Sequence, residues 1–260
     1  MPLVHAGYHK IASVWFENVL SDVAGRYGLT FSSTYLPFIK RDPVFRLRQP
    51  APEVGPPTWI GDVNLFMHSR NFSDELFADR PIRGTHIVRD PRDVAVSGYR
   101  YHLWTDEEWV HTPYDGFGGR SYQETLRSLP ESEGLLLEVG RTCRWTVAEM
   151  RAWDYTRSDF LELRYEDLIE DEDSGFERIF RHYGFTDAAV ETSVEIARKH
   201  SFKAMTGRAI GEEGGNSHLR SGKPGEWRAR FGEEHVELFK RMGNDVLVML
   251  GYEHDDSWTA

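Results

Sequence analysis

A lysine and a serine lie at the predicted start of a helix, in the segment HAGYHKIASVWF (residues 5–16). The first N–H groups of a helix have no partner within the helix, and they carry a partial positive charge that attracts anions. Lys10 adds a point charge beside these groups, and Ser13 adds a hydroxyl. The segment therefore predicts a site for a phosphate-like anion, although a strand–turn–helix with an incidental surface lysine would give the same pattern.

The residue after Lys10 distinguishes this loop from those that hold nucleoside triphosphates. In a triphosphate loop the lysine is followed directly by Ser or Thr, whose hydroxyl helps to hold Mg²⁺. Ile11 occupies that position here. We therefore expect no metal ion at this loop, and the sequence disfavours a kinase or an ATPase.

A second candidate for anion binding is the segment IVRDPRDVAVSGYRYH (residues 87–102). Arg89 lies at the end of a predicted strand, and Ser97 follows eight residues later, about two helical turns along the chain. A guanidinium can donate two parallel hydrogen bonds to a phosphate. These side chains predict a second phosphate site, and an ion pair of Arg89 with Asp90 or Asp93 is the structural alternative.

Short apolar segments alternate with longer segments of helical periodicity along the chain. Predicted strands cover residues 2–8, 63–68, 84–89 and 159–166. Predicted helices cover residues 13–27, a segment from Pro91 onward, and residues 134–153, 175–183, 188–200 and 233–250. The alternation predicts an α/β fold with a central parallel sheet flanked by helices, and the length of 260 residues favours a single domain over residues 1–260.

The carboxyl ends of the predicted strands are where a ligand should bind in such a sheet. A side chain of potential function follows each strand: Lys10, His68, Arg89 and Tyr165. Because parallel strands end at the same edge, we expect these side chains to cluster there.

At these positions the chain resembles the sulfotransferases that use 3′-phosphoadenosine 5′-phosphosulfate (PAPS). GYHKIASVW (residues 7–15) resembles their 5′-phosphosulfate loop, and IVRDPRDVAVSGY (residues 87–99) resembles their 3′-phosphate segment. LRYEDL (residues 163–168) resembles the strand end with their adenine-contacting tyrosine, and RSGKPGEW (residues 220–227) resembles their late Arg-x-Gly-x-x-Gly-Asp-Trp loop. The resemblance spans most of the chain and implies a P-loop-nucleotide-hydrolase-like sulfotransferase fold. It also implies transfer of a sulfuryl group from PAPS to a hydroxyl or amine of an acceptor, with no metal.

The resemblance assigns roles to individual positions. The 5′-phosphosulfate would be held by Lys10, Ala12, Ser13 and Val14, and Ala12 and Val14 would act through their backbone N–H groups. The 3′-phosphate would be held by Arg89, Ser97, Arg220, Ser221 and Gly222. The adenine would be contacted by Trp15 and Tyr165. Trp15 also fits the apolar face of its helix, and Tyr165 could instead cap the sheet, so both alternatives stay open.

Several positions depart from the family pattern. Ala12 stands where the family usually has glycine, Val14 stands where it has a second hydroxyl, and Glu226 replaces an aspartate. A hydrogen bond to a charged group contributes about 1.5–3 kcal/mol, so the valine implies weaker binding of the 5′-phosphate. The short dimerisation motif of the family has no clear counterpart, which leaves the oligomeric state open.

His68, in LFMHSRNF (residues 65–72), is our candidate for the general base, and Lys10 is the candidate that stabilises the leaving group. His68 follows a predicted strand and precedes Arg89 by 21 residues, which matches the place of the family's catalytic histidine. A neutral imidazole accepts a proton readily near pH 7. The flanking residues lack the family's Lys-Thr-His-Leu pattern, and His9 and Glu17 are alternatives.

The acceptor is the least defined part of the prediction. One segment is rich in rings: Tyr99, Tyr101, His102, Trp104, Trp109, His111, Tyr114 and Phe117. These side chains could form an apolar acceptor pocket or a lid within a loop at residues 103–120, or they could simply pack that loop onto the body of the protein. We expect a small alcohol or phenol as acceptor.

Composition excludes several other classes of function. The formal net charge of −11 disfavours nucleic acid as a partner. The single cysteine, Cys143, excludes a disulfide within the chain and a thiolate metal cluster. No apolar run approaches the ~18 residues of a membrane span, and we find no secretion signal, so we expect a cytoplasmic protein without membrane association.

Two other functions remain as alternatives. A kinase-like, nucleotide-dependent phosphotransferase would depend on ATP and Mg²⁺, and the residue after Lys10 argues against it. A non-catalytic nucleotide-binding module of the same fold would need Arg89 and Ser97 but not Lys10 or His68.

Overall fold

Parallel strands form the centre of the fold in the computed structural model, which describes residues 1–33, 65–68, 72, 77, 80–215 and 220–260. Within these residues the strands are β1 (Leu3–Ala6), β2 (Phe31–Ser33), β3 (Leu65–His68), β4 (Arg83–Val88) and β5 (Phe160–Arg164). Their order in the sheet is β2-β3-β1-β4-β5, and each neighbouring pair is parallel. The predicted α/β class with a central parallel sheet is confirmed.

Chain contacts divide the described residues into two units. The first, which we call the sheet unit, comprises Met1–Val88 and Asp154–Arg208, and it contains all the strands named above. The second, the helical unit, comprises Arg89–Trp153 and Ala209–Ala260. The single domain over residues 1–260 stays a prediction.

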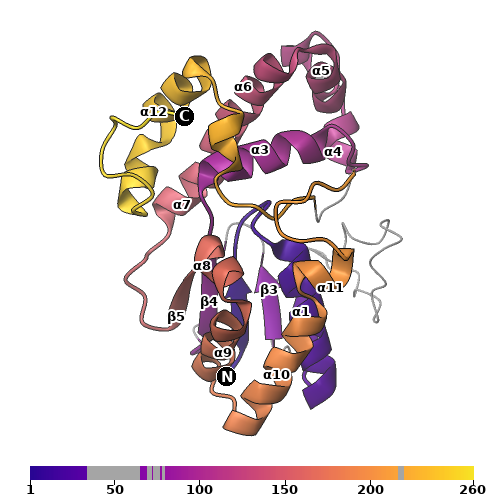
Figure 1. Cartoon of the computed structure of the whole chain (residues 1–260), viewed down its shortest axis with the longest axis vertical. Helices are drawn as coiled ribbons and strands as arrows, with labels where there is room; N and C mark the ends of the chain where they lie inside the picture. Colours follow the sequence, from indigo (N-terminus) through magenta and orange to yellow (C-terminus); the bar gives the residue numbers. More distant parts are fainter. Residues whose placement is uncertain (34–64, 69–71, 73–76, 78–79, 216–219) are drawn as a thin grey trace. The chain divides into compact units, whose positions relative to one another are not determined.

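The helices of the sheet unit include α1 (Ser13–Tyr27), which packs on the sheet through an aromatic contact. They also include α8 (Tyr165–Glu170), α9 (Glu172–His182), α10 (Asp187–Lys199) and α11 (Phe202–Thr206). Helix α10 packs against both α1 and α9 (Figure 1). Phe16 of α1 stacks on His5 of β1 with 3.8 Å between ring centroids, and Phe176 of α9 contacts Phe16 in turn. Helix α1 ends at Tyr27, as predicted, and Gly28 after it adopts a left-handed conformation.

The helical unit is organised around three longer helices. These are α3 (Pro91–His102), α6 (Glu131–Thr142) and α12 (Glu233–Met249), and α6 packs against both of the others (Figure 1). Shorter elements are α4 (Glu108–His111), η2 (Asp115–Phe117), α5 (Tyr122–Ser128), η3 (Cys143–Val147), α7 (Ala148–Ala152) and η4 (Glu226–Ala229). Pro91 occupies the first turn of α3, and the carboxylate of Asp90 caps this helix by accepting a hydrogen bond from the Arg92 N–H at 2.9 Å.

The structure corrects several predicted boundaries. The helix predicted over residues 134–153 is interrupted by a π-helical turn at Cys143–Val147, and the loop predicted over residues 103–120 contains α4 and η2. Strand β2, which is only three residues long, was not predicted.

Some features lie beyond what the structure describes. Parts of the predicted strand at residues 63–68 and of the glycine-rich segment between α11 and η4 lie outside the described residues, as does the side chain of His68. None of the helices in the described ranges has both the length and the apolar character that crossing a membrane requires.

Candidate active site

The carboxyl edge of the sheet brings together positions predicted from the sequence. Within the sheet unit, Lys10 lies in the loop between β1 and α1, His68 is the last residue of β3, and Tyr165 follows directly after β5. Strand β1 is hydrogen bonded to β3 and to β4, and β4 is hydrogen bonded to β5. Because these strands are parallel, their carboxyl ends lie at one edge, where the sequence placed the ligand.

The loop before α1 has the backbone geometry of an anion site. Lys10 and Ala12 both have positive φ values, 64° and 55°, which are left-handed conformations that residues with a Cβ rarely adopt. Ile11 N–H donates to the Tyr8 carbonyl oxygen at 3.4 Å, and the Ser13 hydroxyl donates to the same oxygen at 3.5 Å. The N-cap residue of α1 is Ala12, whose methyl group cannot accept a hydrogen bond, so the first-turn N–H groups have no side-chain cap. This arrangement fits an anion at the N-terminus of α1.

A buried polar chain anchors this loop to the sheet. The Tyr8 hydroxyl is hydrogen bonded to Nε2 of His86 at 2.9 Å, and Nδ1 of His86 is hydrogen bonded to the Glu162 carboxylate at 2.6 Å. Tyr8 and His86 are buried. These hydrogen bonds link the loop to β4 and β5. They were not predicted, because the three residues lie far apart in the sequence.

The environment of Trp15 fits both of its predicted roles. Its indole is buried and packs edge-to-face on Phe176, with ring centroids 5.1 Å apart, as expected for the apolar face of α1. The indole Nε1 is buried and has no hydrogen-bond partner among the described residues. A buried donor of this kind is costly unless something accepts from it, so it fits a polar ligand such as a nucleobase. Tyr165 is also buried, at the first position of α8.

Arg89 and its neighbours belong to the helical unit. Asp90, which was one alternative partner for Arg89, accepts hydrogen bonds from the Arg92 guanidinium, the shortest at 2.7 Å. Burial raises the pKa of Asp93 to about 6, and the positive charge of Arg89 partly offsets that rise. Asp93 and Ser97 are four residues apart in α3 and therefore lie on one face of the helix. The electrostatic link between Arg89 and Asp93 agrees with the structural alternative, so the phosphate role of Arg89 stays a prediction.

Arg92 is a buried structural residue in the same segment. Its guanidinium lies over the rings of Trp227, at 3.8 Å, and Trp258, at 4.6 Å, and it pairs with Glu253 at 2.5 Å. The sequence did not separate the roles of the two arginines in RDPRD.

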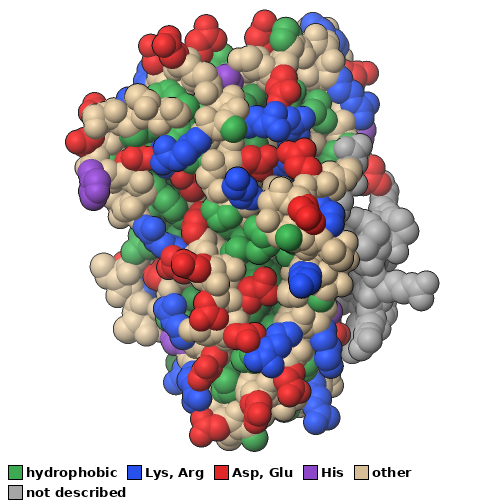
Figure 2. All heavy atoms as spheres, in the orientation of Figure 1, with side chains coloured by type: hydrophobic (Ala, Val, Ile, Leu, Met, Phe, Trp, Pro, Cys, Tyr) green, Lys and Arg blue, Asp and Glu red, His purple; other side chains and the backbone are tan. Residues whose placement is uncertain are grey.

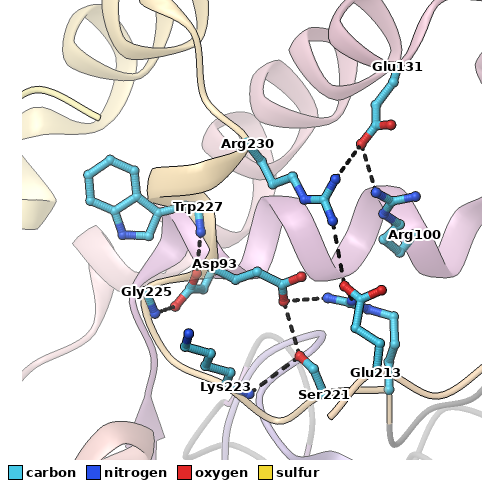
Figure 3. Close-up of polar contacts among 11 residues, drawn as sticks. Asp93, Arg100, Glu131, Glu213, Ser221, Lys223, Gly225, Trp227 and Arg230 are labelled. Atoms are coloured by element: carbon cyan, nitrogen blue, oxygen red, sulfur yellow. Dashed lines mark hydrogen bonds and ion pairs between the residues drawn. The ribbon is translucent and has the colours of Figure 1, made fainter. Parts of the chain in front are cut away.

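Asp93 attaches the late loop, residues 220–227, to α3. Its carboxylate accepts a hydrogen bond from the N–H of Gly225 at 2.6 Å and another from the N–H of Trp227 at 2.9 Å (Figure 3). Gly225 has φ +75°, a conformation that favours glycine. The late loop is thereby fixed next to the helix that begins after Arg89.

The predicted phosphate ligands of the late loop take part in an ion-pair network (Figure 3). Arg220 pairs with Glu226 and with Glu213, the latter at 2.9 Å, and the Ser221 hydroxyl donates to Glu226 at 3.2 Å. The network continues through Glu213, Arg230, Glu131 and Arg100. Glu226 departs from the aspartate of the family pattern, and its contacts were not predicted from the sequence.

A family model for the sulfotransferase domain matches residues 72–247. The chain belongs to the sulfotransferase family. The match includes Arg89, Ser97, Tyr165 and the late loop, which represent three of the four segments on which the resemblance was based; the fourth, residues 7–15, lies before the matched range. Sulfuryl transfer is therefore the activity of this chain. No curated protein sequence matches it.

Solved structures share the sulfotransferase fold. A mouse sulfotransferase, SULT7A1, complexed with PAP is similar with a TM-score of 0.57 and 17% identity, over 95% of this chain and 84% of that one. Retinol dehydratase in complex with androsterone and inactive cofactor PAP is similar with a TM-score of 0.53 and 16% identity, over 95% of this chain and 80% of that one. Retinol dehydratase in complex with retinol and PAP is similar with a TM-score of 0.54 and 16% identity, over 100% of this chain and 83% of that one. At these identities the likeness concerns the fold.

Proposed function

We propose that the chain moves the sulfuryl group of PAPS to a hydroxyl or amine of a small-molecule acceptor, leaving 3′-phosphoadenosine 5′-phosphate (PAP). The observation that supports this donor best is the loop before α1, where left-handed Lys10 and Ala12 precede a helix start without a side-chain cap. Ser13 and Val14 complete the predicted 5′-phosphosulfate site. Arg89, Ser97 and the late loop are the proposed 3′-phosphate site, and Trp15 and Tyr165 are the proposed adenine contacts.

The reaction needs an in-line displacement at sulfur. The acceptor oxygen forms a bond to sulfur, the bond from sulfur to the bridging oxygen breaks, and its electron pair stays with the nucleotide. Lys10 and the N–H groups of α1 would stabilise the charge that develops on this oxygen, and this preorganised stabilisation is often the largest catalytic term. His68 would take the proton of the acceptor, and the mechanism needs no metal.

The acceptor is proposed to be a small alcohol or phenol. The retinol dehydratase structures contain androsterone and retinol, both small apolar molecules. In this chain, several rings of the aromatic segment pack on one another: the His102 ring contacts Trp109 and Tyr122, and Glu138 accepts hydrogen bonds from His102 and Tyr122. These contacts support the interpretation that much of the segment packs the loop. Tyr114, 62% exposed, is a better candidate to meet an acceptor.

Nucleic acid and membranes are not proposed as partners, and a cytoplasmic location stays a prediction. On the face shown in Figure 2, acidic and basic side chains are interspersed rather than gathered by sign. This distribution, with the net charge of −11, supports a small anionic ligand over a long polyanion.

Calorimetry in the presence of EDTA tests the donor assignment. We expect PAP to bind more tightly than ATP without added metal, and Arg89→Ala to weaken PAP binding by at least tenfold while the unfolding temperature changes little. Arg144→Ala, at an exposed position of the helical unit, is the matched control and should bind normally. Equal affinity for PAP and ATP, or ATP binding that depends on Mg²⁺, would refute the donor assignment and favour a phosphotransferase.

A further inference from the structure

Glu226 contacts the two side chains of the late loop that are expected to hold a phosphate. Its Oε2 accepts a hydrogen bond from the Arg220 guanidinium and another from the Ser221 hydroxyl, the latter at 3.2 Å. The three side chains are largely shielded from water: Ser221 is 4% exposed, and the side chains of Arg220 and Glu226 are 18% and 15% exposed. A shielded ion pair of this kind is screened less by salt than one at the surface.

The charge of Glu226 is retained at neutral pH. Burial by itself would raise the pKa of this carboxyl, but the hydrogen bond and charge of Arg220, with a smaller contribution from Ser221, hold the pKa below its usual value. The carboxylate therefore presents an anionic oxygen to a guanidinium and a hydroxyl at once. A phosphate oxygen makes the same pair of contacts, because both groups accept charge-assisted hydrogen bonds.

The backbone around Glu226 is fixed, so the length of its side chain determines its reach. The residues on either side, Gly225 and Trp227, both donate their N–H groups to Asp93 (Figure 3). Aspartate, the family's usual residue here, is shorter by one methylene, or about 1.5 Å. A carboxylate shortened by that distance at a fixed backbone would lose part of its contact with Arg220 and Ser221.

We propose that Glu226 is an internal competitor for the 3′-phosphate. In the nucleotide-free protein it occupies Arg220 and Ser221, and a nucleotide with a 3′-phosphate must displace it to bind them. Glu226 therefore sets the affinity for 3′-phosphorylated adenine nucleotides without affecting nucleotides that lack this group. The inference rests on the proposed function, because it takes Arg220 and Ser221 as ligands of the 3′-phosphate.

Two substitutions test the charge and the side-chain length of Glu226 separately. Glu226→Asp keeps the charge and shortens the side chain, and Glu226→Gln keeps the length and removes the charge. Each is measured by calorimetry with PAP and with adenosine 5′-monophosphate, which lacks the 3′-phosphate. We expect both variants to bind PAP roughly tenfold more tightly than the wild type, equivalent to about 1.4 kcal/mol, and to bind the monophosphate equally.

A matched control is Glu237→Gln, which removes the same charge from an exposed position of α12. It should leave both affinities unchanged. If Glu226→Asp binds PAP as the wild type does or more weakly, and the wild type still prefers PAP to the monophosphate, Glu226 orients Arg220 for the phosphate and the competitor inference is wrong. If the wild type and both variants bind PAP no better than the monophosphate, the donor assignment fails and the inference fails with it.

Discussion

The left-handed conformation of Ala12 gives a stability prediction that can be worked out from the backbone. Ala12 has φ 55° and ψ 21°, a conformation that costs about 1–2 kcal/mol for a residue with a Cβ. Glycine adopts it without this cost but loses ~0.4–1 kcal/mol more in conformational freedom on folding than alanine does. The methyl group of Ala12 makes no cap that would be lost. We therefore expect Ala12→Gly to raise the free energy of unfolding by about 0.5–1 kcal/mol.

Thermal unfolding measures this effect. For a chain of this size, 1 kcal/mol corresponds to about 2–4 °C, so the expected rise in Tm is about 1–4 °C. The matched control is Ala148→Gly at the start of α7, where φ is −65° and the residue is exposed. Glycine in an ordinary helical position should lower stability by ~1 kcal/mol. If both variants lost stability to a similar extent, Ala12 could not be in the left-handed conformation and the proposed geometry of the loop would be wrong.

Two further predictions concern His68, the candidate base, and Glu17, one of its alternatives. Burial raises the pKa of Glu17 from 4.5 to about 7, with a smaller opposite effect of the Ser33 hydroxyl, so the native state keeps this proton longer than the unfolded state does. The free energy of unfolding of the wild type should therefore fall as the pH rises from 4.5 to about 7. Glu17→Gln should not show this fall, and denaturant titrations at about pH 8 should find it more stable than the wild type by up to ~3 kcal/mol. The same dependence of stability on pH in both proteins would contradict this. His68→Asn should lower turnover by ~10²–10⁴-fold with unchanged PAP affinity, and near-normal turnover would transfer the base role to His9 or Glu17.

The starts and ends of helices could be predicted from the sequence, because residues close to them in the sequence determine them. Helix α1 begins at Ser13 and ends before Gly28, and Pro91 lies in the first turn of α3. The backbone preferences of glycine and proline act within a few residues, so they leave a local signal in the sequence. The three-residue β2 was missed because so short a segment has no periodicity of its own and forms through pairing with β3. The π-helical turn at Cys143–Val147 was missed because the apolar pattern over residues 134–153 is that of one continuous helix.

The places of the candidate ligands in the fold could be predicted from the sequence, but the contacts that support them could not. Lys10 follows β1 and Tyr165 follows β5 as the motifs indicated. Partners distant in the sequence could not be inferred. The contact of Tyr8 with His86 spans 78 residues, and that of Asp93 with Trp227 spans 134. Spacing within one element leaves a sequence signal, whereas such tertiary hydrogen bonds do not.

The surroundings of Arg92 give the last residues of the chain a structural role. Glu253 and Trp258 follow helix α12, and together with Trp227 they contact the guanidinium of Arg92, whose side chain is 1% exposed. Arg92 is in the first turn of α3, three positions after Arg89. Residues 253–258 are therefore part of the support for the segment that is proposed to hold the 3′-phosphate. Homologues that are shorter at this end should show compensating changes, such as an apolar residue in place of the buried arginine.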